Sequence, residues 1–573
     1  MYRENTKHLQ IAWISNVNDL PEKQRKRLEE SWAGVFYREF FSRIDESVFA
    51  VLFSKIPSRP NVAVNVLLGL DTLKAGFGWS DEEMHDAFLF DVQVRYALGY
   101  RQLGEGEFDE RTIYNFRRRV AKHLLETGEN LIEKAFEQVT DQQVKAYQLK
   151  TGKLRMDSTQ IASNICNTTR LRLLVEVLQR TQRMLGETDQ KRYADEFGPY
   201  LKGNAGKYVY RVKAGEGKEH LQRIGELMRR LVDELAAPYG NEHTYRILKR
   251  VFGEHFVVTE AANLRPKQGK ELSAKSLQSP DDEEASYRQK RGQDYVGYVG
   301  NLTETCDPEN DFQLIVKVQV EPNTTDDAKM LNEALPELKK RTDLDEINVD
   351  GGYSSADVDD TLQELEIDLV QTAIRGAKPS SESLGLEDFQ WEFKANGQPQ
   401  KVTCPQEVQV SVISGRTKDR FLAYFSAEDC DTCPFSDKCP TEPLKRRPKH
   451  VLRFSKQQVN VARRRQRTAQ ARASGQNLRA AVEATVRSVK HRFRNGKVPV
   501  RGQPRVSVVV IGSAAMSNVR RIWRYLSAKK TEESQEETQG TPSDTPVFLF
   551  WYRLSRFFSS HFAHQSLPWA VGL

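Results

Sequence analysis

Strand-like apolar runs alternate with helical patterns in the middle of the chain, and this alternation constrains the fold more than any other feature. In chain order the expected elements are strands at 154–161, 295–302 and 312–320, a helix near 326–340, a strand at 346–349, a helix near 356–366 and a strand at 367–372. Such alternation is typical of strands and helices that pack in layers. The sequence therefore predicts an α/β fold in which helices flank a mixed sheet.

The rest of the chain is organised around this core. At 573 residues, the chain is longer than one hydrophobic core usually supports. Five segments are expected: an N-terminal helical domain at 1–150, the first part of the core at 151–374 with a largely helical insertion at 165–290, a cysteine-containing insertion at 375–455, the second part of the core at 456–528, and a linker with an apolar tail at 529–573. The second part of the core should contain a long basic helix at 456–494, a short strand at 506–511 and a final helix at 518–526.

Three acidic residues stand out within this arrangement. Asp157 lies in the first strand-like run, Asp350 follows the run at 346–349, and Glu483 lies on the basic helix. A buried carboxylate is costly unless it binds a metal ion or accepts hydrogen bonds. Mg²⁺ prefers hard oxygen ligands, and two such ions can stabilise the attacking and leaving oxygens of a phosphodiester. The three residues are therefore candidate ligands of two Mg²⁺ (or Mn²⁺) ions, and a cap or turn role is the alternative for each aspartate.

Two cations accompany Glu483. On an ideal helix Arg479 and Lys490 lie within about 40° of Glu483 around the axis. One helix face would then offer a carboxylate for metal and two cations for phosphate groups. The alternative is an ordinary charged helix face in contact with solvent.

These features together resemble a known family. An aspartate on the first strand, an aspartate after the fourth and a glutamate on a late helix resemble the RNase H-like fold of DDE transposases. More narrowly, the chain resembles bacterial insertion-sequence transposases with a Y-(2)-R-(3)-E-(6)-K signature, because Arg479, Glu483 and Lys490 match three of its four positions. Gln476 stands at the tyrosine position. The resemblance covers residues from about 40 to 525, and it includes Glu304-Thr-Cys306 in the second strand.

The resemblance implies an enzyme that cuts DNA at insertion-sequence ends by water attack and directs the freed 3′-OH at target DNA. Asp157, Asp350 and Glu483 would be the catalytic, metal-holding residues, and Arg479 and Lys490 would contact DNA. The partners would be the double-stranded DNA of the terminal inverted repeats and the target, and a second copy of the chain as a homodimer in the synaptic complex. We expect a cytoplasmic, nucleoid-associated bacterial protein.

Basic residues support a polyanionic partner. The net charge of +7 is modest, but lysine and arginine crowd at 445–449, 463–467 and 487–497. In the N-terminal domain, Arg117 and Arg118 belong to an arginine run that could face phosphates or lie on a solvated helix face. The segment 59–119 resembles the N-terminal helical domain of the same transposases, so we expect it to bind DNA.

A cysteine cluster lies between the last core strand and the Glu483 helix. Cys430, Cys433 and Cys439, with Cys404 upstream, offer four thiolates, and four thiolates suit a tetrahedral structural zinc site. Unpaired thiols are the alternative. The remaining cysteines, Cys166 and Cys306, are expected to be ordinary buried thiols.

Other features exclude some classes of protein. Six cysteines are too few for a secreted disulfide scaffold of this size, and the N-terminus has no signal-peptide pattern. No stable membrane span is expected, because charged and histidine residues interrupt the apolar tail at 547–573. No P-loop sequence is present. Two function classes remain: an active transposase, or a catalytically inactive or domesticated zinc-containing DNA-binding protein or related nuclease.

Overall fold

The computed structural model describes residues 1–539 except 11–14, 57–59, 166–167, 214, 261–262, 291, 373, 375–381, 395–396, 474–477 and 491–495. Cys166, Gln476 and the expected apolar tail at 547–573 therefore lie outside the described residues. By its internal contacts the chain divides into a unit of Met1–Ile522 and a unit of Trp523–Leu573. The elements below, except the end of the last helix, belong to the first unit.

The N-terminal region is helical, as predicted. Its α-helices are α1 (Glu22–Glu30), α2 (Trp32–Glu39), α3 (Val64–Phe77), α4 (Asp81–Phe90), α5 (Val92–Ala97), α6 (Glu110–Thr127) and α7 (Leu131–Ala146). Helix α3 is buried along nearly its whole length, because its leucine and valine side chains pack on several sides. Helix α4 begins at a capping box in which Ser80 and Glu83 satisfy each other's backbone N–H groups.

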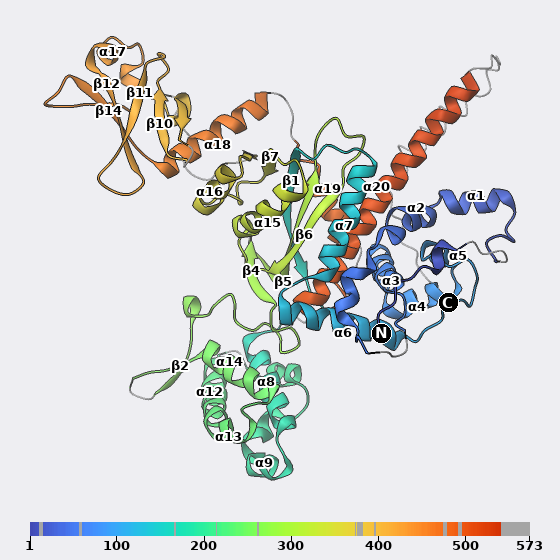
Figure 1. Cartoon of the computed structure of the whole chain (residues 1–573). Coiled ribbons are helices and arrows are strands. Elements are labelled where there is room, and N and C mark those ends of the chain that lie inside the picture. Colours follow the sequence, from blue (N-terminus) through green and yellow to red (C-terminus); the bar gives the residue numbers. More distant parts are fainter. Residues whose placement is uncertain are drawn as a thin grey trace, which may run out of the picture. The chain divides into compact units, whose positions relative to one another are not determined.

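The central sheet confirms the predicted fold class. Its strands are β1 (Lys153–Ala162), β4 (Ser286–Lys290), β5 (Gln293–Thr305), β6 (Ile315–Pro322), β7 (Glu346–Val349) and β8 (Asp368–Gln371). The order is β4-β5-β1-β7-β8, and β6 also pairs with β5. Strand β5 is antiparallel to β1 and β6, whereas β7 and β8 run parallel to β1. The sheet is thus mixed, and β1 lies between β5 and β7 (Figure 1).

Two helices cover one face of this sheet. Helices α15 (Asp327–Arg341) and α16 (Ala356–Glu364) alternate with β6, β7 and β8 in the chain, as the sequence predicted. Their apolar side chains share a core with Leu154, Met156, Ile347 and Val349 of the strands. This face of β1 therefore belongs to the hydrophobic core, and the opposite face is left for other contacts.

The insertion after β1 forms a bundle with a core of its own (Figure 1). Its helices are α8 (Arg170–Met184), α9 (Glu187–Arg192), α10 (Ala194–Phe197), α11 (Ala205–Arg211), α12 (Gly217–Glu234), α13 (Ala236–Tyr239) and α14 (His243–His255). The expectation of a helical segment up to residue 290 is wrong beyond His255, where the short pair β2 (Phe256–Val258) and β3 (Leu264–Pro266) and then the sheet strand β4 follow.

A second sheet forms in the cysteine-containing segment. It has the order β13-β14-β12-β11-β10-β9. The strands are β9 (Gln390–Phe393), β10 (Pro399–Thr403), β11 (Gln409–Ser414), β12 (Arg420–Ser426), β13 (Glu442–Pro443) and β14 (Lys449–Ser455), with the short helix α17 (Ala427–Asp431) after β12. Phe389, Phe421, Phe425 and Phe454 fill its small core.

The C-terminal part differs from the sequence prediction in two respects. The predicted basic helix at 456–494 is two helices, α18 (Lys456–Ala473) and α19 (Val482–Lys490). The predicted strand at 506–511 and final helix at 518–526 are parts of one long helix, α20 (Gln503–Gln539), which also includes the start of the predicted linker. Among the described helices, none combines the length and apolar character that a membrane span requires.

Candidate active site and nucleic-acid contacts

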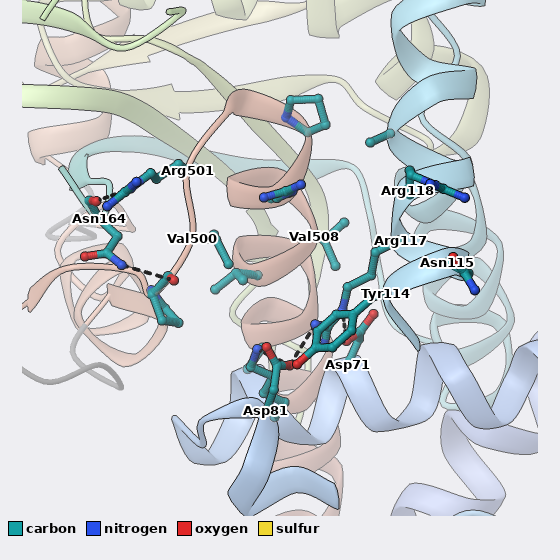
Figure 2. A pocket seen from close by; sticks show the side chains of 17 residues that line it. Asp71, Asp81, Tyr114, Asn115, Arg117, Arg118, Asn164, Val500, Arg501 and Val508 are labelled. Carbon is teal, nitrogen blue, oxygen red and sulfur yellow. Dashed lines mark hydrogen bonds and ion pairs between the residues drawn. The ribbon is translucent and has the colours of Figure 1, made fainter. Parts of the chain in front are cut away.

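The predicted DNA contact Arg117 is engaged inside the protein. Its guanidinium donates to Asp71 through Nε at 2.9 Å and to Asp81 through Nη1 at 2.7 Å (Figure 2). These ion pairs join α6 to α3 and α4, and the two carboxylates raise the pKa of Arg117 despite its burial. Arg117 therefore has a structural role in holding these helices together, and the expectation that it faces phosphates is not supported.

Arg118 has a different environment. Its side chain is exposed, and no described residue forms a hydrogen bond or ion pair with it. Together with Arg505 at the start of α20 it lines a cavity of about 490 Å³ between α3, α6 and α20. Arg501, another lining residue, donates to the Asn164 carbonyl at 2.6 Å (Figure 2). Arg118 thus remains available to an anionic partner.

Asp157 lies on the face of β1 that points away from the α15 core. Leu154 and Met156 are fully buried in that core, so the alternation along the strand places Arg155 and Asp157 on the opposite face. Helix α19 packs against β1. The Asp157 carboxylate is nearly buried and accepts hydrogen bonds at Oδ1 from the Ser158 backbone N–H, at 3.0 Å, and from Arg479 Nη2, at 3.2 Å.

Asp350 directly follows β7, the strand next to β1. Strands β1 and β7 are parallel, and their last recorded pair is Arg155 with Asn348. Two residues beyond this pair are Asp157, still in β1, and Asp350, one residue past the end of β7. The Asp350 carboxylate accepts the Gly352 N–H at 2.6 Å, which fixes the turn after β7.

The electrostatics of Asp157 reflect this neighbourhood. Burial raises the pKa of Asp157 above its ordinary value, and the nearby charge of Asp350 acts in the same direction. The Arg479 guanidinium opposes both effects, because it favours the ionised carboxylate. The structure therefore brings together two of the three predicted carboxylates and one predicted cation.

Glu483 is placed close in the fold but makes no contact with the aspartates. It is the second residue of α19, whose buried side is formed by Val482, Thr485, Val486 and Val489. The Glu483 side chain is exposed and has no hydrogen bond or ion pair with any described residue. Within the described ranges, no group of three or more His, Cys, Asp or Glu side chains is arranged so that it could hold a metal ion.

The two cations expected beside Glu483 occupy different settings. Arg479 lies in the turn before α19, so the expectation that it shares a helix face with Glu483 is wrong. From this turn it pairs with Asp157. Lys490 at the end of α19 is half-buried, and burial lowers its pKa. It lines a very small cavity with Thr159 of β1.

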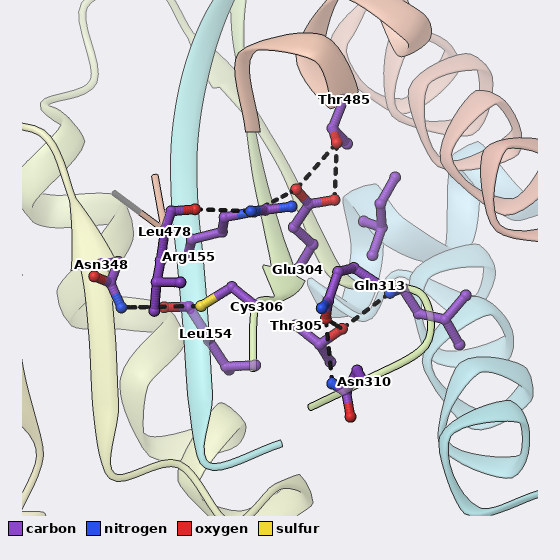
Figure 3. A network of polar contacts seen from close by, with 12 residues as sticks. Leu154, Arg155, Glu304, Thr305, Cys306, Asn310, Gln313, Asn348, Leu478 and Thr485 are labelled. Atoms are coloured by element: carbon purple, nitrogen blue, oxygen red, sulfur yellow. Dashed lines mark hydrogen bonds and ion pairs between the residues drawn. The ribbon is translucent and has the colours of Figure 1, made fainter. Parts of the chain in front are cut away.

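A buried polar network lies beside Asp157 and was not predicted as a site. Glu304 of β5 stands directly opposite Arg155 of β1 and is fully buried. Its carboxylate accepts from Arg155 Nε at 2.7 Å and from Thr485 Oγ1 of α19 at 2.8 Å (Figure 3). It also accepts from Arg521 Nη1 of α20 at 2.7 Å. The network thus joins two strands to two C-terminal helices.

Comparison with known proteins bears on the same C-terminal segment. The family model described as a transposase DDE domain matches residues 403–523. Residues 403–523 are thus similar to a transposase DDE domain. The matched part contains the cysteine segment from the end of β10, helices α18 and α19 with Glu483, and α20 up to residue 523. No curated protein and no solved structure gave a match to the chain.

The matched DDE domain segment includes the four predicted zinc ligands. Cys404, Cys430, Cys433 and Cys439 together line a small cavity of about 30 Å³ beside the second sheet. The Phe435 N–H donates to Cys433 Sγ at 3.4 Å, and the Thr441 hydroxyl donates to Cys439 Sγ at 3.3 Å. Burial and the three neighbouring thiols raise the pKa of Cys430 to about 11. The four thiols therefore line one small cavity, although within the described ranges they do not form a group arranged to hold a metal ion.

A partial signal for Glu304 is present in the sequence. Burying a charged side chain is costly, so a glutamate that follows the uncharged run Tyr295–Thr303 indicates a paired partner. The partners Arg155, Thr485 and Arg521 are 149 to 217 positions away in the chain, and no local pattern identifies them. Cys306 is buried, as expected.

Proposed function

We propose that this chain is an insertion-sequence transposase that cuts DNA at the element ends and joins the freed ends to target DNA. The observation that carries the proposal is the position of the matched DDE domain segment. Its Glu483 helix packs on β1, the strand that bears Asp157, and Arg479 of the same segment pairs with Asp157. Asp350 directly follows β7, the strand that pairs with β1.

We propose that Asp157, Asp350 and Glu483 hold two Mg²⁺ or Mn²⁺ ions. The donor set fits hard cations, because all three side chains offer carboxylate oxygens. Oδ2 of Asp157 and of Asp350 has no hydrogen-bond partner among the described residues, and both Glu483 oxygens are likewise unengaged there. Since Glu483 makes no contact with the aspartates, the three carboxylates would come together only when metal and DNA phosphate are present. When bound, the ions would activate a water molecule and stabilise the leaving oxygen of a phosphodiester.

The protein's own side chains would orient this chemistry. In the first step a water oxygen bonds to the scissile phosphorus and loses its proton to solvent, the P–O3′ bond breaks, and the leaving O3′ takes a proton from solvent. In the second step that 3′-OH bonds to a target phosphorus and loses its proton to solvent, and the displaced 3′ oxygen of the target strand takes a proton. Arg479 would keep Asp157 ionised in both steps, because its positive charge opposes the effect of burial on the carboxylate.

We propose Arg118, Arg479 and Lys490 as the DNA contacts of the enzyme. Arg118 lines the cavity between the N-terminal helices and α20, whereas Arg117 is excluded by its ion pairs. Arg479 and Lys490 would contact phosphates close to the carboxylates, as the family resemblance implies. Two element ends must be held at once during transposition, so we propose that the chain acts as a homodimer on double-stranded terminal repeats.

A cleavage assay tests the proposal. The substrate is labelled duplex DNA that carries the sequences flanking the encoding gene, incubated with the full chain and Mg²⁺. The wild type should nick the element end, and Asp157→Asn, Asp350→Asn and Glu483→Gln should each lose cleavage while keeping DNA binding. Arg487→Ala, a charge change at an exposed position of α19, serves as the matched control. Equal cleavage by the wild type and Asp350→Asn would refute the assignment.

We further propose that Cys404, Cys430, Cys433 and Cys439 bind one structural zinc ion. Four thiolates that surround a small cavity suit tetrahedral zinc, and the backbone and hydroxyl donors to Cys433 and Cys439 are of the kind that stabilise a metal thiolate. Protein purified under reducing conditions should contain one zinc per chain, and Cys430→Ser with Cys433→Ser should contain none. Zinc content near zero in the wild type would reject this site.

A second candidate function is a DNA-binding protein without cleavage activity, or a related nuclease. Two features favour it: Glu483 is exposed and pairs with none of the residues that the structure describes, and Gln476 stands at the expected tyrosine position. The same assay separates the candidates. DNA binding without cleavage by the wild type would favour the inactive protein, and cleavage of any branched DNA without strand transfer would favour the nuclease.

A further inference from the structure

Glu304 is the most completely enclosed charged side chain near the proposed active site. It has no exposed surface, and its two oxygens accept hydrogen bonds of 2.7 to 3.0 Å from Arg155, Thr485 and Arg521. The three donors come from β1, α19 and α20, which are far apart in the sequence. Arg521 also donates to the Thr485 hydroxyl, so two of the three partners of Glu304 contact each other as well.

This network forms hydrogen bonds with the Glu483 helix and with the turn that precedes it. Thr485 lies two residues after Glu483, in the first turn of α19. Arg155 uses a second nitrogen, Nη1, to donate to the Leu478 carbonyl at 2.7 Å, immediately before Arg479 (Figure 3). The segment that carries both Arg479 and Glu483 is therefore held on each side by groups bound to Glu304.

The same network is fixed to the strand that bears Asp157. Arg155 and Asp157 are two residues apart on one strand, so their side chains share a face. Arg155 and Glu304 are direct neighbours across the β1–β5 pair. A buried carboxylate held by charged donors tolerates little displacement, because hydrogen bonds weaken steeply with distance and angle and an unpaired buried charge is costly. An apolar contact would permit α19 to slide or roll further.

We propose that Glu304 is a positioning residue that sets the place of the Glu483 helix relative to Asp157. This inference rests on the proposed function, because it assigns Glu304 to the assembly of the three-carboxylate site. Glu304 would touch neither metal nor DNA. It would act through Thr485 and Arg155, which fix α19 so that a small movement of Glu483 completes the site with Asp157 and Asp350.

The test uses variants that break the network with little change of shape. Glu304→Gln removes the charge, Thr485→Val removes the hydroxyl, and Thr485→Ser retains it. Glu137→Gln is the matched control, because Glu137 is a nearly buried carboxylate in a separate ion-pair network with Lys317 and Arg341. If Glu304→Gln does not fold, Thr485→Val compared with Thr485→Ser still tests the inference.

The first readout is the Mg²⁺ concentration that gives half-maximal cleavage. Glu304→Gln and Thr485→Val should raise it by about tenfold or more, as disruption of groups that orient metal ligands does in other sites. The maximal rate should fall while the KM for DNA stays within about twofold, because the phosphate contacts are unchanged. Thr485→Ser should resemble the wild type, and Glu137→Gln should lower stability without altering the Mg²⁺ dependence.

The second readout does not require activity. Fe²⁺ in place of Mg²⁺, with ascorbate and peroxide, cuts the polypeptide near the bound ion. With DNA present, the wild type should be cut near both residue 157 and residue 483, and Glu304→Gln should be cut near 157 only. Cuts near both positions in folded Glu304→Gln would overturn the positioning role alone. The same holds if Glu137→Gln also loses the cut near residue 483. No cut near residue 157 in the wild type would instead refute the proposed metal site, and the inference would fall with it.

Discussion

The pairing of Arg479 with Asp157 gives the candidate site its most specific residue contact. Both side chains are largely buried, at 18% and 11% exposure, and their atoms lie 3.2 Å apart. An arginine beside a buried aspartate favours the ionised form, which a metal ligand requires. The guanidinium therefore has an electrostatic role at this position, beyond any contact with DNA.

Replacement of Arg479 should affect cleavage more than DNA binding. Arg479→Ala should lower the cleavage rate by about 100-fold, the size expected when one well-placed electrostatic group is removed. The cleavage rate of Arg479→Lys should lie between those of the wild type and Arg479→Ala, because lysine keeps the positive charge but lacks the planar guanidinium group. Single-turnover cleavage and a separate binding titration measure the two effects. Arg487→Ala is the control, and an equal loss of binding and cleavage would contradict the electrostatic role.

The stability of the helical insertion should depend on pH through a single residue, His255. Burial lowers the pKa of His255 to about 4, and neither ring nitrogen has a hydrogen-bond partner among the described residues. Because the folded-state pKa lies below the unfolded value of about 6.5, the unfolded chain takes up the proton first as the pH falls. Stability from the neutral imidazole is therefore present above pH 6.5 and is lost as the pH falls toward 4.

The comparison of wild type with His255→Leu isolates this effect. The wild type should lose roughly 2 to 3 kcal/mol more stability than the variant between pH 7.5 and pH 4.5. Urea denaturation at several pH values, followed by circular dichroism, measures the difference. Parallel pH profiles for the two proteins would show that His255 titrates normally.

At the scale of elements, α20 shows the limit of local periodicity. The run at 506–511 is apolar without a clear period, so a buried strand and a buried helix fit it equally well. The helix forms because tertiary contacts bury Val506, Val509, Val510 and Ile511 on more than one side. One of those contacts is with α3, where Arg520 donates to the Gly76 carbonyl at 2.7 Å.

The close approach of α3 and α20 makes Gly76 sensitive to substitution. A methyl group on Gly76 would lie 2.6 Å from Met516 Cβ and 2.3 Å from Cγ, too close for contact. Gly76→Ala should therefore destabilise the protein by about 1 to 2 kcal/mol, because overpacking outweighs the better helix propensity of alanine.

A second substitution should relieve that clash. Met516→Ala alone should cost about 2 to 5 kcal/mol, since Met516 is fully buried. The double variant should be at least about 1 kcal/mol more stable than the sum of the single effects predicts. Urea denaturation of the wild type, the two single variants and the double variant gives the coupling free energy between the two positions. Strict additivity of the two single effects would refute the contact.

At the scale of the whole molecule, a buried lysine attaches the N-terminal helices to the central sheet. Lys317 of β6 is 6% exposed and pairs with Glu133 at 3.0 Å and Glu137 at 2.9 Å, both on α7. It also pairs with Glu337 of α15. Arg341 of α15 reinforces the same carboxylates.

Loss of Lys317 should weaken this attachment strongly. Lys317→Met leaves three carboxylates without their shared cation, and breaking a buried ion pair from one side costs about 3 to 5 kcal/mol. Lys150→Ala, which removes an exposed pair with Glu309, should leave the denaturation midpoint unchanged. The midpoint of urea denaturation and the hydrogen exchange of α7 measure both effects. A midpoint shift of equal size for the two variants would contradict the attachment role.

The sequence by itself determined the order of most core elements, although strand β4 lies where a helical segment was expected. Strand β7 lies where the apolar run predicted it, and Asp350 follows it, because a short apolar run next to a glycine turn is a local signal. The alternation along β1 likewise settled which face Asp157 shares with Arg155. The parallel pairing of β1 and β7 then placed both aspartates two residues beyond the last recorded pair.

Only the tertiary structure decided how the C-terminal helices meet that sheet. The division of the basic segment into α18 and α19, the reach of Arg479 to Asp157 and the burial of Glu304 depend on partners more than 140 residues away. Periodicity reports the local backbone, whereas these contacts arise from packing and from the pairing of buried charges. For that reason the sequence named Glu483 but not the network that holds its helix.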